Sequence, residues 1–282
     1  MKWDLGLNFY SEKVILLNPI DLNKSENIHS LNENDYHIYI IGKKKKFFFE
    51  SFKTSKDYNI TVLYYLDDNH EKKKIEVKHS KELHINGFED GFYNINYKGN
   101  ENINIRDFAL VANFFSIQND IVGDSIQQNL PSDLEVIYVG QAFGRKQNRK
   151  IDYRIKKHEK IQEIALSALD RGSNEEVLVI GVTIKTNDIA TSLILNTENV
   201  QKPTLKSMYS LRDKASKRLT DGQALTVFEA SLIRYFQPKL NTHYKETFPS
   251  PDFTSYDEIY GTDFNYVSFA IHTEPIATRL YS

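Results

Sequence analysis

The sequence predicts an α+β protein with two parts. Residues 1–104 are predicted to form an N-terminal antiparallel β domain, and residues 105–282 a small α/β domain with a central antiparallel sheet flanked by helices. Three observations indicate this division. The chain has 282 residues, enough for two domains that each bury a core. Aromatic and β-branched clusters dominate the first part, and strand-like and helix-like segments alternate from Asp133 onward.

Five strands are predicted in the first part, because short runs of aromatic and β-branched residues alternate there with polar turns. They are Tyr36–Ile41, Phe47–Phe49, Ile60–Tyr65, Lys74–Val77 and Phe92–Tyr97.

The second part is predicted to contain strands and two long helices. The strands are Leu134–Val139, Glu176–Ile184 and Tyr266–His272, preceded by one near Arg106–Ser116. The helices are Asp152–Leu169 and Thr220–Phe236. The second helix has firm boundaries, because Thr220 and Gln223 form a capping box and Pro238 cannot continue a helix.

Composition excludes several classes of protein and of site. There is no cysteine, so disulfides, thiolate zinc sites and a cysteine nucleophile are excluded, and any metal must use oxygen or imidazole ligands. The longest apolar runs are too short for a membrane span, and the first ten residues do not resemble a secretion signal. We therefore expect a cytoplasmic protein.

The net charge of −2 offers no long-range attraction for nucleic acid, so charge must be considered locally. One stretch of the second part is clearly basic. Such a run is more often a solvated face than a binding site. Its candidate nucleic-acid-binding residues are Arg145, Lys146, Arg149, Lys150 and Lys157.

Two polar residues lie on the apolar stripe of the first predicted helix. Arg154 and His158 fall on the stripe defined by Ile161, Ala165 and Leu169, so they are predicted to point towards the sheet. An inward arginine is costly unless an anion or a carboxylate meets it. A structural arginine with an internal carboxylate partner is the alternative.

The second predicted helix carries a carboxylate in the equivalent place. Glu229 falls between Ile233 and Phe236 in angle on the buried stripe. The alternatives are a structural pair with Arg154 or a glutamate that reaches solvent from the edge of the stripe.

Together these residues favour a site for phosphate chemistry. Arginine matches phosphate oxygens with a planar fork, and glutamate is a hard oxygen ligand for Mg²⁺. Histidine or tyrosine can transfer a proton.

The order of these residues resembles the GIY-YIG nuclease superfamily over about Asp133 to Asn241. The resemblance rests on Ile137-Tyr138-Val139-Gly140-Gln141, then Arg154 and His158 four apart, then Glu229 with Leu232 and Ile233, then Pro238, Leu240 and Asn241.

The resemblance implies a DNA endonuclease that uses Mg²⁺ or Mn²⁺, with RNA left open as a substrate. Tyr138 would line the site, Arg154 would bind the scissile phosphate, and His158 would assist binding or proton transfer. Glu229 would hold the metal and Asn241 would support the site. The β domain would then select a substrate or partner, in a role such as restriction, defence or repair.

One motif of the family has no clear copy. Its first Gly-Ile-Tyr strand usually lies just before the second motif and supplies a tyrosine thought to act as general base. Gly91-Phe92-Tyr93 is far from Tyr138, and a strand at Phe108–Phe115 offers Phe instead. Either the hairpin carries a long insertion, or another group takes the proton.

If another group takes the proton, we favour His158 over the tyrosines as the general base, because its reference pKa near 6.5 leaves the side chain largely neutral at neutral pH. A catalytically inactive module that binds nucleic acid or protein is the alternative function.

Overall fold

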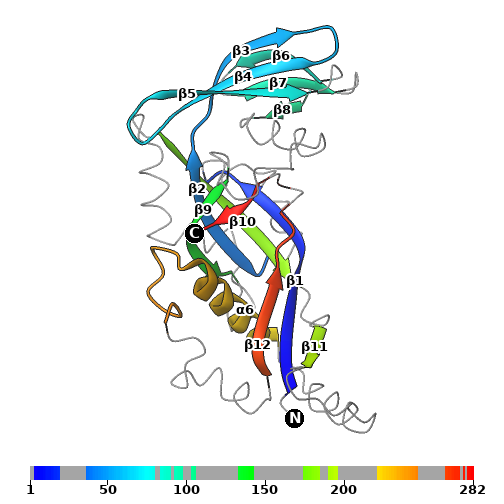
Figure 1. The fold of residues 1–282 in the computed structure, drawn as a ribbon, viewed down its shortest axis with the longest axis vertical. Coiled ribbons are helices and arrows are strands. Elements are labelled where there is room, and N and C mark those ends of the chain that lie inside the picture. The colour runs from blue at the N-terminus through cyan, green and yellow to red at the C-terminus, as the bar shows by residue number, and fades with distance from the viewer. Residues whose placement is uncertain are drawn as a thin grey trace.

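The computed structural model describes the chain in segments (Figure 1). They are residues 3–19, 36–79, 83–89, 92–97, 103–105, 133–142, 174–184, 190–195, 221–246, 264–273, 276 and 278–282.

A curled seven-stranded sheet forms the larger body. Its order is β11 (Ala190–Leu195), β1 (Trp3–Leu17), β10 (Glu175–Ile184), β2 (Ile38–Lys45), β9 (Leu134–Gln141) and β13 (Leu280–Tyr281). The seventh strand, β12 (Phe264–Ala270), also pairs with β1. The sheet is mixed, because β12 is parallel to β1 and β13 is parallel to β9. Strand β10 is a nearly continuous apolar run that is buried from Val177 to Ile184, as expected for a strand inside a covered sheet.

Two smaller antiparallel sheets lie between β2 and β9 in the chain. One contains β3 (Phe48–Thr54), β4 (Asn59–Leu66) and β5 (Lys72–His79), and the other β6 (Leu83–Glu89), β7 (Phe92–Tyr97) and β8 (Ile103–Ile105). Figure 1 shows both beyond the end of the large sheet at which β2 leaves it.

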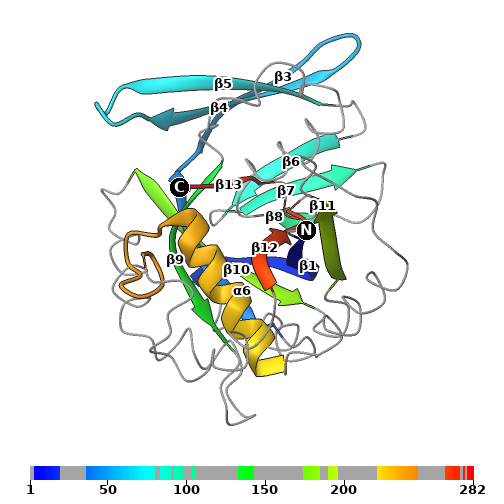
Figure 2. The same cartoon turned by 60° about the horizontal axis from the view of Figure 1, so that its bottom comes forward.

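Helix α6 (Asp221–Phe236) crosses one face of the large sheet (Figure 2). The fully buried Phe228 packs against Phe9 of β1, with ring centroids 5.4 Å apart. The helix ends where Gln237 takes a left-handed φ of 47°, immediately before Pro238. The predicted helix Thr220–Phe236 is thus confirmed to within one residue. Within the described part of the chain, no helix is long and apolar enough to cross a membrane.

The large sheet has two buried faces, and successive side chains of β2 point to one face and then the other. Ile38 and Ile40 belong to the core cluster that includes α6, and we call this side the helix face. Tyr39 and Ile41 belong to a second cluster on the opposite side, which we call the tyrosine face.

The prediction of an α+β fold is wrong for the described residues, in which thirteen strands accompany one helix. The alternating pattern after Asp133 predicts an antiparallel sheet flanked by helices. In the structure β1 and β2 pair with β10, and two strands of that sheet are parallel to their neighbours. Such pairings join distant segments and leave little local trace in sequence.

Candidate functional site

Strands β2 and β9 are antiparallel neighbours although residues 46–133 separate them in the chain. Their register pairs Tyr39 with Gly140 and Ile41 with Tyr138. The two strands therefore form a hairpin whose loop is replaced by a long insertion that contains β3 to β8.

A β-bulge in this pair sets the direction of the Tyr138 side chain. Ile41 is opposite Tyr138 and Gly42 is opposite Val136, so Ile137 is the extra residue. Ile137 and Tyr138 consequently both pack on the tyrosine face, whereas Val136 packs on the helix face.

The rings of Tyr39 and Tyr138 stack across the two strands. Their centroids are 5.8 Å apart with an interplanar angle of 27°. Tyr39 is 1% exposed, and Tyr138 is partly buried. A Cβ atom at Gly140 would lie 2.5 Å from both Cζ and Oη of Tyr39, so only glycine lets the Tyr39 ring lie over β9. We call Tyr39 and Tyr138 the tyrosine pair, and Gly140 is the residue that makes room for it.

A third tyrosine, Tyr36, belongs to the same cluster. Burial raises the pKa of the Tyr36 phenol. Tyr36 therefore stays protonated at neutral pH.

The turn after α6 covers the outer edge of β9 next to the tyrosine pair. The backbone N–H of Leu240 donates to the Ile137 carbonyl at 3.1 Å. The side chain of Asn241 bonds both backbone groups of Val139, accepting from its N–H at 2.9 Å and donating to its carbonyl at 2.8 Å. Asn241, which the resemblance assigns a supporting role, thus contacts the residue between Tyr138 and Gly140.

An ion pair extends this contact towards the start of β9. Lys239 Nζ donates to Glu135 Oε1 at 2.7 Å, and Lys43 lies on the other side of the same carboxylate. Burial acts to raise the pKa of Glu135, but the two lysines outweigh burial and lower the pKa. The Glu135 carboxylate therefore stays charged, and the ion pair persists, when the pH falls somewhat below the ordinary pKa of glutamate. The turn bonds backbone groups of β9 that a neighbouring strand would otherwise bond, and it covers this edge of the sheet.

We expect Asn241→Ala to lower the free energy of unfolding by about 1 to 3 kcal/mol, because it leaves the N–H and carbonyl of Val139 without these partners. Urea unfolding measures the change. Thr242→Ala is the matched control, because Thr242 is the exposed neighbour and should change stability by less than about 0.5 kcal/mol. Equal effects of the two substitutions would contradict the structural role of Asn241.

Glu229 lies on α6 and is partly exposed, in contrast to its buried neighbours Leu225 and Ile233. The helix packs on the helix face, whereas the tyrosine pair lies on the tyrosine face. The described contacts therefore do not join Glu229 to the tyrosines.

Among the described residues, no three or more His, Asp or Glu side chains gather as a metal site. A single partly exposed carboxylate nevertheless suits Mg²⁺, which commonly keeps several waters and takes one or two protein carboxylates plus substrate phosphates.

Several predicted site residues lie outside the described residues. They are Arg154 and His158, on the predicted helix Asp152–Leu169, and the basic residues Arg145, Lys146, Arg149, Lys150 and Lys157.

Sequence reasoning missed Tyr39. Its signal was the tripeptide His37-Ile38-Tyr39, in a predicted strand but with histidine in place of the first glycine. The literal match Gly91-Phe92-Tyr93 is not its equivalent, because Tyr93 lies in β7, which pairs with β6 and β8. The strand predicted at Phe108–Phe115 lies outside the described residues.

No family model matches the chain, and no curated protein and no solved structure matches it either.

Proposed function

We propose that the chain is a metal-dependent endonuclease of the GIY-YIG type that hydrolyses phosphodiester bonds in DNA, with Mg²⁺ or Mn²⁺ as cofactor. The pairing of β2 with β9 carries this proposal, because it brings Tyr39 over Gly140 and beside Tyr138. The motif with no clear copy in the sequence is then His37-Ile38-Tyr39, and residues 46–133 are the insertion in its hairpin.

The proposed reaction is a single hydrolytic displacement. The oxygen of a water molecule attacks the phosphorus, and one P–O bond to the sugar breaks. The water proton passes to a base on the protein, and the departing oxygen takes up a proton. Tyr39 joins His158 and Tyr138 as a candidate base, and we now place Tyr39 first because of its position over Gly140.

The remaining roles follow the resemblance. Arg154 would bind the scissile phosphate, which a guanidinium fork suits, and the basic residues from Arg145 to Lys157 would attract the phosphate backbone. Glu229 would hold the metal ion, which supplies charge stabilisation at the phosphoryl oxygens and the leaving group. Asn241 would keep β9 in place behind Tyr138.

The rival function, an inactive module that binds nucleic acid or protein, was favoured mainly by the missing first tyrosine. We assign that role to Tyr39, which pairs with Gly140, and this assignment weakens the argument for the rival function. We place the activity in the cytoplasm, with which the absence of cysteine is compatible.

A nuclease assay tests the proposal directly. Purified protein is incubated with supercoiled plasmid, single-stranded DNA or RNA, each with Mg²⁺, with Mn²⁺ or with a chelator. We expect divalent-dependent nicking or linearisation of the plasmid. Glu229→Gln should reduce cleavage by at least about 100-fold at limiting Mg²⁺, because an amide is a much poorer ligand for a hard cation.

The control compares Glu229→Gln with wild type in thermal unfolding, and the two should melt within a few degrees of each other. A folded Glu229→Gln variant that cleaves at the wild-type rate would refute the metal role. No cleavage of any substrate with either metal would refute the nuclease assignment.

A further inference from the structure

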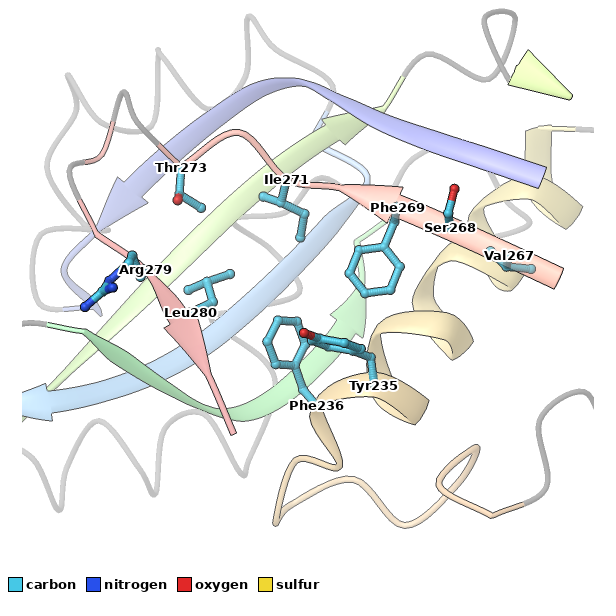
Figure 3. A pocket seen from close by; sticks show the side chains of 9 residues that line it. All are labelled: Tyr235, Phe236, Val267, Ser268, Phe269, Ile271, Thr273, Arg279 and Leu280. Atoms are coloured by element: carbon cyan, nitrogen blue, oxygen red, sulfur yellow. The ribbon is translucent and has the colours of Figure 1, made fainter. Parts of the chain in front are cut away.

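A groove of about 480 Å³ opens between the C-terminal end of α6, strand β12 and the start of β13 (Figure 3). Its floor is apolar: Phe236 is buried, and Phe269, Ile271 and Leu280 pack against the core on the helix face. We call it the α6–β12 groove.

Tyr235 forms one wall of the groove and is 67% exposed. Its ring makes edge contacts with Phe236 and Phe269, at centroid distances of 4.9 Å and 5.3 Å. An exposed aromatic ring that is already held in one orientation loses little entropy when a partner covers it. Residues of this kind are typical anchors of protein interfaces.

The opposite wall is the edge of a strand. Three successive residues of β12 line the groove: Val267, Ser268 and Phe269. Because successive side chains of a strand point to opposite faces, a groove lined by all three residues must run along the backbone edge of β12. Strand β12 pairs with β1 on one side, and on its other side no described strand pairs with it. Within the described part of the chain, its outward N–H and carbonyl groups are therefore a template for another strand.

The groove also lies between strands from distant parts of the large sheet. Strand β12 pairs with β1 and strand β13 with β9, and residues of both β12 and β13 line the groove. Figure 3 shows β12 on one side, β13 on the other and the two α6 aromatics between them.

Among the described residues that line the groove, the one charged residue is already paired. Arg279 Nη2 and Nε donate to the two carboxylate oxygens of Asp133, at 2.9 Å and 3.2 Å. The Asp133 side chain is 4% exposed, so the pair is shielded on that side. The described lining thus presents no unbalanced charge to a phosphate or a carboxylate, and it favours uncharged side chains.

We propose that the α6–β12 groove binds an extended peptide segment of a partner protein. The segment adds as a strand to the outer edge of β12 and places apolar side chains at alternate positions against Tyr235 and Phe269. A short segment fits better than a second copy of the chain, because stable dimers bury about 1,200–2,000 Å² in total, far more than a groove of this size presents. The groove lies on the helix face, so this proposal is independent of chemistry at the tyrosine pair.

Selection from a phage library of random linear seven-residue peptides on the full chain tests the proposal. We expect enriched peptides with apolar residues at alternate positions. The most enriched peptide, labelled with fluorescein, is then measured by fluorescence anisotropy. Tyr235→Ala should weaken its binding by about tenfold or more, as expected for an aromatic anchor. Tyr10→Ala should leave binding unchanged, because Tyr10 is 51% exposed and, next to the buried Phe9, points to the opposite face of β1.

Two backbone-methylated forms of the selected peptide test the strand geometry. Each form carries N-methyl groups at every second residue, in one of the two possible phases. Strand addition requires that one phase abolishes binding and the other retains it, since only alternate N–H groups face β12. Equal behaviour of the two phases, equal binding to Tyr235→Ala, or no enriched peptide would overturn the proposal. Dimers of the wild-type chain that dissociate in Tyr235→Ala would also overturn it.

Discussion

Tyr39→Phe should lower the rate of DNA cleavage by about 10²- to 10⁴-fold, the usual contribution of a general base. The substitution removes the hydroxyl that would take the proton and keeps the ring that stacks on Tyr138. The loss of one hydrogen-bonding group should change the free energy of unfolding by about 1 kcal/mol. Single-turnover cleavage of plasmid and urea unfolding measure the two effects separately.

The dependence of the rate on pH identifies the base. A base acts in its deprotonated form, so the rate rises with pH up to its pKa. A histidine with a reference pKa near 6.5 makes the profile level off near neutral pH, whereas a tyrosine near 10 lets the rate keep rising. We expect a continuing rise in the wild type and in Tyr138→Phe, and its loss in Tyr39→Phe. If Tyr39→Phe keeps the wild-type profile and His158→Ala removes the activity, Tyr39 only packs and His158 is the base.

Gly140→Val should destabilise the fold by about 1 to 3 kcal/mol or more, the usual cost of overpacking a core, and should abolish cleavage. The first added atom would lie 2.5 Å from Cζ and Oη of Tyr39 and 2.8 Å from Cε1 of Tyr138. The Tyr39 ring is 1% exposed and held in the core of the tyrosine face, so it cannot swing aside without disturbing β2. Thermal and urea unfolding measure the loss.

Gly222→Ala is the matched control, because no atom lies within 4 Å of the Cβ position at Gly222 in α6. This change should be neutral or stabilising by up to about 1 kcal/mol, since alanine favours helix.

The double variant Gly140→Ala/Tyr39→Ala tests the contact itself. If the ring causes the strain, Gly140→Ala should cost less in the Tyr39→Ala background than in the wild type. Additive effects would show that the clash lies elsewhere.

Elements with a strong local pattern could be predicted from sequence. The helix ends at Phe236 as expected, because apolar spacing and Pro238 are local signals. Strands at Ile60–Tyr65, Phe92–Tyr97 and Glu176–Ile184 agree with β4, β7 and β10 to within a residue or so. Strand β1 was not among the predicted strands, because its first half mixes polar and apolar residues.

Within the candidate site, the apolar stripe of the predicted helix singled out Glu229, and the resemblance to the nuclease superfamily singled out Tyr138, Gly140 and Asn241. Sequence alone could not find Tyr39, whose role depends on a partner strand beyond residues 46–133. Glycine at position 140 is explained by the rings of Tyr39 and Tyr138, which leave no room for a Cβ atom there. Local periodicity thus determined where helix α6 and several strands form. Which strands pair depended on long-range burial and hydrogen bonding, which only the folded chain decides. These pairings produce the mostly β fold of the described residues, the tyrosine pair and the outer edge of β12.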